Sequence, residues 1–427
     1  MNEKLLQTTS SKKDIYAHNL KYFKWLEFFS SLYFIVPIWV IIELKFLTLS
    51  ELLIVEGVIA GSQLFLELPT GALADLLGRK NTITLGFLIG AIGFGLFSFA
   101  TNFIQFLIIG ILFGLQASLI SGAKEALVFD TLKQAHREEE YSPLINKLQI
   151  IFNWGIAGAT LIGGLMFALN FYLPGILNGL AFLIATFIAA KLIEPDIDSE
   201  IFTLKNYLKQ TKEGFRELFK TPQSKDISLY YILIGGLTWP FVVALQNISL
   251  TLMGFNEKQM GLIIPAMMLG SIYILHFLIK KDFFKKQHFV FYFLAILIIP
   301  SLLLGWWLNI YLVIPILFAI SLASSTRGNV LGKLSNQQYS SKNRATAISS
   351  LSMAISLIYV LVMLAFSKLG QTNDNALNIM YLSMGLISLF TILPMSLKLA
   401  KKNYKKEIDL NLDTEPEIYE APVKTKG

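Results

Sequence analysis

The chain has 427 residues, of which 54% are hydrophobic and 15% are charged, and its formal net charge is +7. Soluble domains carry roughly 25% charged residues, so a soluble fold could not bury this much apolar surface. Cysteine is absent and the four histidines are scattered, which excludes disulfides and thiolate sites and predicts no metal site. The basic residues lie in short segments between apolar runs, a pattern that indicates membrane topology rather than a nucleic-acid surface.

Apolar runs long enough to cross a hydrocarbon core of ~30 Å recur along almost the whole chain. A helix satisfies its own backbone groups in such a core. The sequence therefore predicts an all-α polytopic membrane protein with twelve transmembrane helices. The expected spans are 21 to 43, 49 to 76, 81 to 100, 103 to 133, 144 to 169, 172 to 192, 226 to 252, 257 to 280, 287 to 307, 309 to 334, 343 to 368 and 376 to 398.

Two six-helix bundles are expected, because a polar stretch divides the spans and the two halves resemble each other. The stretch from Ser121 to Gln134 aligns with the stretch from Ser324 to Gln337, which pairs Lys124 with Arg327. Many carriers are built from two related halves. The expected division is an N-terminal tail at 1–20, a first bundle at 21–192, a linker at 193–225, a second bundle at 226–400 and a C-terminal tail at 401–427.

Lysine and arginine are concentrated on one side of the predicted membrane. Only Lys45, Lys258 and Lys368 fall in the loops of the opposite side. By the positive-inside rule, we expect a multi-pass protein of the cell membrane, inner or plasma, with both termini, the linker and the tails in the cytoplasm.

The second predicted span ends in a polar segment from Gly71 to Lys80 that reads GALADLLGRK. Asp75 precedes Arg79 by four residues, so the two can form a charge pair that holds a short turn. The segment resembles the loop motif G-x-L-A-D-x-x-G-R-K of the major facilitator superfamily of secondary transporters, and every fixed position matches. The resemblance implies two bundles that rock around a central cavity. It also implies a cytoplasmic gate, to which we assign Gly71, Asp75, Gly78, Arg79 and Asp130.

Two other stretches refine this resemblance. Glu67 to Gly71 reads ELPTG and Ser121 to Leu127 reads SGAKEAL, and the pair is similar to a branch of the superfamily that combines ELPTG with SG-x-x-EAL. Proton-coupled drug exporters carry G-x-x-x-G-P-x-x-G-G on the fifth helix, whereas the stretch from Gly155 to Gly164 lacks the proline that kinks it. This loss weakens the interpretation as a drug exporter.

Glu56 and Glu67 lie inside the second predicted span, where a charge costs a few kcal/mol and therefore faces a cavity or a partner. Their spacing brings them back to nearly the same helix face, ~16 Å apart along the axis. Glu67, which lies beside Pro69, is the first candidate to carry a coupling proton, and Glu56 is the second. A static hydrogen bond, or an ion pair with Lys124, would explain Glu67 equally well.

Candidates for substrate contact lie on several other predicted spans. Lys124 and Arg327 occupy matching positions and could jointly hold an anionic group, although their depth also fits cytoplasmic interface anchors. Glu125 follows Lys124 and is included with it. The aromatic and amide candidates are Asn153, Trp239, Gln246 and Asn247. Aromatic residues in spans also serve as packing or interface belts.

Simpler roles remain open for several charges. Glu27 follows Lys24 by three residues, so a local pair near the interface is expected for both. Arg79 and Lys80 also fit positive-inside anchors, and Asp130 also fits a solvated helix end.

The chain lacks a nucleotide-binding loop, an HExxH motif and a segment large enough for an ATPase domain, so no enzymatic activity and no cofactor are expected. The sequence predicts a secondary active transporter that moves a small organic solute by alternating access, coupled to protons, with export slightly favoured. The alternatives are an uptake permease for a metabolite or chelate, and a non-transporting membrane sensor or scaffold with a carrier fold. The expected partners are a small-molecule substrate, protons and the lipid bilayer, without nucleic acid, and the expected state is a monomer.

Overall fold

The computed structural model describes residues 2–196, 204–340, 343–373 and 375–401. The side chains of residues 2–14, Leu68, Asp75, Leu204, Lys205, Tyr207 and Thr372 lie outside the described part. Within these ranges the chain is almost entirely helical, and ten helices are long and apolar enough to cross a membrane. Together with α1, α2 and the shorter apolar helix α7, they occupy each of the twelve predicted spans. The all-α polytopic fold expected from the sequence is confirmed.

The first group of helices runs from α1 to α7 and encloses an aromatic core. Phe182 of α7 is fully buried, and its ring centroid lies 5.7 Å from that of Phe87 and 4.6 Å from that of Phe94 on α4. Rings at such separations attract each other beyond the area that they bury. The helices are α1 (Asn2–Ser30), α2 (Trp39–Leu44), α3 (Leu49–Leu77), α4 (Arg79–Phe97), α5 (Phe103–Gln134), α6 (Tyr141–Leu169) and α7 (Leu173–Ala189).

The second group runs from α9 to α16 and has a larger core of its own. Tyr230 of α9 is fully buried, donates to the carbonyl oxygen of Phe291 at 3.1 Å and lies 2.8 Å from Ser396 Oγ, so its hydroxyl joins three helices. The elements are α9 (Pro222–Pro240), η2 (Phe241–Leu245), α10 (Gln246–Leu252), α11 (Glu257–Lys280), α12 (Gln287–Leu304), η3 (Gly305–Trp307), α13 (Val313–Thr326), η4 (Arg327–Leu331), α14 (Gly332–Asn336), α15 (Arg344–Thr372) and α16 (Ala376–Lys401). η2 and η4 are π-helical turns inside otherwise continuous spans, a local widening that often marks functional positions.

A further helix, α8 (Leu204–Leu218), lies within the stretch expected as a polar linker. Its Glu217 accepts hydrogen bonds from the backbone N–H of Ser340 at 2.9 Å and from Asn343 Nδ2 at 3.2 Å. Burial by itself raises the pKa of the Glu217 carboxyl, but these donors and Lys220 outweigh it and lower the pKa to about 2. The bonds fix α8 to the start of α15.

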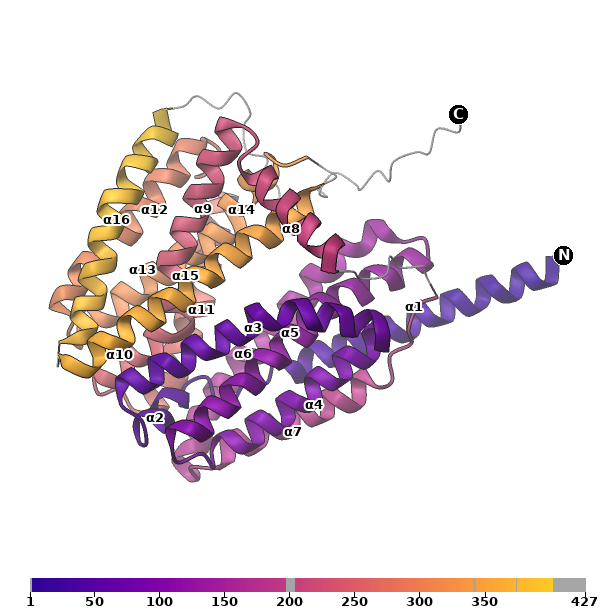
Figure 1. Ribbon diagram of the computed structural model, residues 1–427, viewed down its shortest axis with the longest axis horizontal. Helices are drawn as coiled ribbons and strands as arrows, with labels where there is room; N and C mark the ends of the chain where they lie inside the picture. The colour runs from indigo at the N-terminus through magenta and orange to yellow at the C-terminus, as the bar shows by residue number, and fades with distance from the viewer. Residues whose placement is uncertain (1, 197–203, 341–342, 374, 402–427) are drawn as a thin grey trace.

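The two groups of helices meet at one end of the molecule and spread apart toward the other (Figure 1). At the end where α2 and α10 lie, Tyr359 of α15 donates to Glu56 of α3 at 2.6 Å. We call this end the closed face. The other end carries α8 and the turn at Gly78 between α3 and α4, and we call it the linker face.

Candidate functional site

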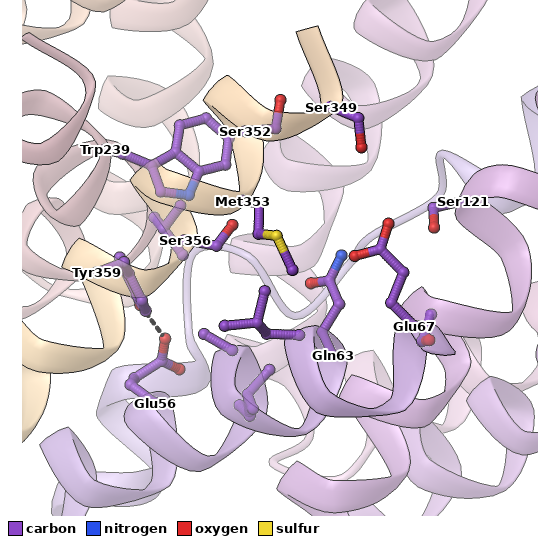
Figure 2. A pocket seen from close by; sticks show the side chains of 15 residues that line it. Glu56, Gln63, Glu67, Ser121, Trp239, Ser349, Ser352, Met353, Ser356 and Tyr359 are labelled. Carbon is purple, nitrogen blue, oxygen red and sulfur yellow. Dashed lines mark hydrogen bonds between the residues drawn. The ribbon is translucent and has the colours of Figure 1, made fainter. Parts of the chain in front are cut away.

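A cavity of about 300 Å³ lies between the two groups of helices (Figure 2). Helices α3 and α15 supply most of its wall. On each of them the lining residues recur every three or four positions and therefore share one face. The lining residues are Glu56, Ile59, Ala60, Gln63, Leu64 and Glu67 of α3, Ser118 and Ser121 of α5, Trp239 of α9, Val243 of η2, and Ser349, Ser352, Met353, Ser356 and Tyr359 of α15.

The wall is polar and acidic for a site inside apolar spans. It combines two carboxyl groups, one amide and five serine hydroxyls with the rings of Trp239 and Tyr359. The described lining residues include no lysine, arginine or histidine. Such a wall can hydrogen-bond a solute and offers it negative charge.

Glu56 closes the cavity on the side of the closed face. Its side chain is 7% exposed, and Tyr359 donates to its Oε2 at 2.6 Å, the bond drawn in Figure 2. Next to it, a Cβ built on Gly57 would lie 3.6 Å from Met363 Cβ, so α3 and α15 are in direct contact here. The hydrogen bond joins the first group of helices to the second.

Glu67 lies toward the linker face and is half-buried. Figure 2 shows its carboxyl group turned into the cavity, beside the amide of Gln63. No hydrogen bond or ion pair of this carboxyl group occurs among the described residues. The expected alternative of a pair with Lys124 is wrong, because Lys124 binds Glu27.

The ELPTG segment lies within α3, which continues through it, and weakens the helix just after Glu67. Pro69 lies inside α3 and has no N–H for the carbonyl of Phe65, which weakens the helix at this point. Thr70 donates to the carbonyl of Leu66 at 2.8 Å and lies 2.7 Å from Ser118 Oγ of α5. The threonine thus ties the weakened turn to the neighbouring helix.

Close packing of α3 against α5 holds this wall in place. A Cβ built on Gly114 of α5 would lie 2.6 Å from the carbonyl oxygen of Ile59 and 2.8 Å from the backbone nitrogen of Gln63. No side chain fits in that space, so glycine is required for the close approach of the two helices. The part of α3 that carries the cavity-facing residues therefore packs directly against α5.

The predicted gate segment forms a tight turn between α3 and α4. Gly78 has φ +84°, a conformation that side chains disfavour, and it separates the two helices. The guanidinium of Arg79 pairs with the carboxylate of Asp130 on α5 and donates to the carbonyl of Ala126 at 3.0 Å. The structure thus brings Arg79 and Asp130 together.

Glu194, which sequence reasoning missed, completes this turn. Its carboxylate accepts hydrogen bonds from the backbone N–H groups of Arg79 and Lys80 at 2.9 and 2.7 Å. The first backbone N–H groups of a helix have no acceptor within the helix, and negative charge is favoured there. Gly71 lies on α3, and the side chain of Asp75 lies outside the described residues.

The basic residues expected to hold an anion do not line the cavity. Lys124 donates to Glu27 Oε2 at 2.9 Å, which joins α5 to α1. The expected local pair of Lys24 and Glu27 is wrong, because Glu27 is buried and takes its partner from the facing helix. Arg327 is 9% exposed, and its guanidinium lies 4.8 Å from the ring centroid of Tyr231.

Among the other candidates, Trp239 lines the cavity and is 39% exposed. Gln246 and Asn247 are buried within α10 and are not among the residues that line the cavity. Asn153 accepts a hydrogen bond from Gln149 on its own helix at 3.0 Å, and Glu125 is exposed on α5. Sequence reasoning missed Gln63, Tyr359 and the serines, although the spacing of the serines along α15 could have revealed one polar face.

Comparison with known proteins places the chain in a family. The family model of the Major Facilitator Superfamily matches residues 28–361. The uncharacterized MFS-type transporter YxaM of Bacillus subtilis (strain 168) is 24% identical over 238 residues, and the match spans 53% of this chain and 57% of that relative. The chain thus matches little more than half the length of this relative.

Solved structures show the same fold at low identity. The nucleoside transporter NupG is 15% identical with a TM-score of 0.69, covering 90% of this chain and 99% of that one. The POT family transporter PepTSo is 12% identical with a TM-score of 0.67, covering 89% and 97%. A bacterial homolog to the human lysosomal transporter Spinster is 14% identical with a TM-score of 0.63, covering 89% and 94%. The chain belongs to the Major Facilitator Superfamily of membrane transporters.

Proposed function

We propose that this protein is a secondary active transporter that moves a small organic solute by alternating access, coupled to protons, with export slightly favoured over uptake. One observation carries the proposal. The cavity is lined by both groups of helices, and its only hydrogen bond between them, among the described lining residues, joins Glu56 to Tyr359. A site shared by two groups that can part is what alternating access requires.

Opening of the closed face requires α3 and α15 to separate, which breaks the bond between Glu56 and Tyr359. Closure of the other side brings the linker face together around the turn at Gly78. We assign the gate there to Asp75, Arg79 and Asp130, with Gly71 and Gly78 as the small residues of the segment. The positive-inside pattern supports a cytoplasmic linker face, with both termini on that side of the cell membrane.

Glu67 is the proposed carrier of the coupling proton. Its carboxyl group faces the cavity and has no partner among the described residues, so it can exchange a proton with water there. A charged carboxyl group is costly at this depth, which makes protonation a natural way to let the helices move. Glu56 is the second candidate, and its bond to Tyr359 opposes free exchange.

Reconstitution in liposomes with a pH gradient tests this proposal. The full chain is assayed with uridine, dialanine and ethidium as probes, in parallel with Glu67→Gln, Asp75→Asn and the exposed control Glu139→Gln. We expect gradient-dependent flux of at least one probe, its loss in Glu67→Gln, and full flux in the control. We also expect Asp75→Asn to lose flux but keep binding of the probe.

The same assay separates the alternatives. Inward accumulation that depends on the gradient would favour the uptake permease over the exporter. Absence of gradient-dependent flux for every probe would favour a sensor or scaffold, in which the carrier fold binds a partner without transport.

A further inference from the structure

We infer that the cavity takes an organic cation, a protonated amine or quaternary ammonium compound that also carries hydroxyl or amide groups. This inference rests on the proposed transport function and names the charge class of its solute. A volume of about 300 Å³ limits the solute to a small molecule.

The ionisable side chains of the described cavity wall are all acidic. The described wall has the carboxyl groups of Glu56 and Glu67 and no basic side chain. The two basic residues that the sequence predicted to hold an anion have other partners, since Lys124 pairs with Glu27 and Arg327 lies on Tyr231. Charges interact far more strongly in a low-dielectric site than in water, so an anion is repelled here and a cation is attracted.

The two carboxyl groups of the wall differ in their freedom to bind an ammonium group. Glu56 already accepts a hydrogen bond from Tyr359 and is 7% exposed. Glu67 is half-buried, turned into the cavity and without a partner among the described residues (Figure 2). Glu67 is therefore the residue that meets the ammonium group.

The rest of the wall offers an aromatic ring and hydroxyl groups. Figure 2 shows Trp239, Ser349 and Ser352 on the side of the cavity away from α3. Trp239 exposes 39% of its surface, and an indole face attracts a cation within ~6 Å of the ring. Ser349 and Ser352 are exposed, and their hydroxyls can donate to and accept from polar groups of the solute.

Two other classes of solute fit this wall less well. A neutral nucleoside would use the serines but would leave the carboxyl group of Glu67 without a partner beside it. A dipeptide brings an ammonium group that Glu67 can bind, but it also brings a carboxylate, for which the described wall has no cation.

A set of three indole probes of different charge tests the inference. Tryptamine is a cation, tryptophol is neutral and indole-3-acetate is an anion, and all three carry an indole ring. Equilibrium binding of each is measured on the purified full chain. We expect tryptamine to bind at least about tenfold more tightly than the other two, because only the cation pairs with Glu67.

Three variants identify the residue responsible. We expect Glu67→Gln to remove the preference for tryptamine, and Glu67→Asp, which keeps the charge, to retain it. Glu139→Gln removes an exposed carboxylate in the short 3-10 turn before α6, outside the cavity, and should behave as the wild type. A thermal unfolding curve for each variant separates loss of binding from loss of folding.

The inference is overturned if tryptamine fails to bind, if tryptophol or indole-3-acetate binds equally well, or if Glu67→Gln keeps the preference. Its failure differs from failure of the proposed function. Gradient-driven flux of a neutral or anionic probe, unaffected by tryptamine, would leave transport in place and refute the cation site. Tight binding of tryptamine without gradient-driven flux of any probe would leave the cation site in place and refute transport.

Discussion

Glu56 and Glu67 lie on one helix and on nearly the same face of it, yet their surroundings differ. Glu56 is 7% exposed and accepts a hydrogen bond from Tyr359 across the two groups of helices. Glu67 is half-buried, and its carboxyl group has no partner among the described residues. Depth along α3 therefore separates the surroundings of the two carboxyl groups. The carboxyl group near the closed face joins the helices, and the one toward the linker face is open to the cavity, where we propose that it meets a solute or a proton.

The largest expected effect comes from locking the closed face beside Glu56. A Cβ at Gly57 would lie 3.6 Å from Met363 Cβ, within the separation of about 3.5–4.5 Å that a disulfide spans, and the chain has no other cysteine. We expect the oxidised double variant Gly57→Cys with Met363→Cys to lose all transport and to regain it on reduction. Binding of tryptamine should survive oxidation, since Glu67 stays in the cavity. Each single variant is the control, and transport by the oxidised protein would refute alternating access at this face.

The next effect compares the two carboxyl groups directly. We expect Glu67→Gln to reduce the initial rate of gradient-driven transport by about a hundredfold, and Glu56→Gln by about tenfold or less, because Glu67 is the proposed carrier of the coupling proton and Glu56 already accepts a hydrogen bond from Tyr359. Initial rates in liposomes measure both. A larger loss in Glu56→Gln than in Glu67→Gln would reverse the assignment and make the carboxyl group at the closed face the coupling site.

A smaller effect is expected when the partner of Glu56 is removed. A hydrogen bond to a carboxylate is worth about 1.5–3 kcal/mol, so Tyr359→Phe should favour opening of the closed face by about 10- to 150-fold. Labelling of Gly57→Cys with a membrane-impermeant maleimide measures the shift as a faster reaction. Tyr273→Phe, which removes an exposed hydroxyl on α11, is the matched control. Equal labelling in Tyr359→Phe and the control would show that the bond does not hold this face.

The smallest effect concerns a carboxyl group outside the spans that has several donors. The pKa of Glu217 is about 2 instead of its ordinary 4.5, so its ionised form stabilises α8 above pH 4.5, and this contribution disappears as the pH falls from 4.5 to about 2. Pepsin, which works in this range, should cleave α8 of the wild type more slowly than that of Glu217→Gln at pH 4.5. The two rates should converge near pH 2. Glu213→Gln, an exposed carboxylate of the same helix, should follow the wild type throughout.

The spans were predictable because hydropathy depends only on local composition. The break between α1 and α2 was not, since the segment from Ser31 to Ile38 is as apolar as its flanks. Pro37 lies in that segment, and its missing N–H disfavours a continuous helix. The helix α8 was missed because its sequence is polar. Such a sequence indicates a linker as long as its contacts with α15 are unknown.

The site was predictable only where a residue is unusual for its surroundings. A carboxylate inside an apolar span stands out, which is why Glu56 and Glu67 were found. The spacing of Ser349 and Ser352 indicates at most a polar face of α15, because serine is ordinary in membrane helices, and only the structure places that face opposite α3. Glu194 is far in sequence from the turn that it caps, and no local pattern connects the two.

The glycine contact between α3 and α5 affects how the affinity for a solute can change during a transport cycle. Because no side chain separates Gly114 from Ile59, we expect the wall formed by Glu67, Ser118 and Ser121 to move as one unit. A solute held by that wall alone would keep the same contacts at both stages of its crossing. Differences in affinity between the two sides of the membrane must then arise from contacts of the solute with Trp239 and the serines of α15, which form at one stage and break at the other.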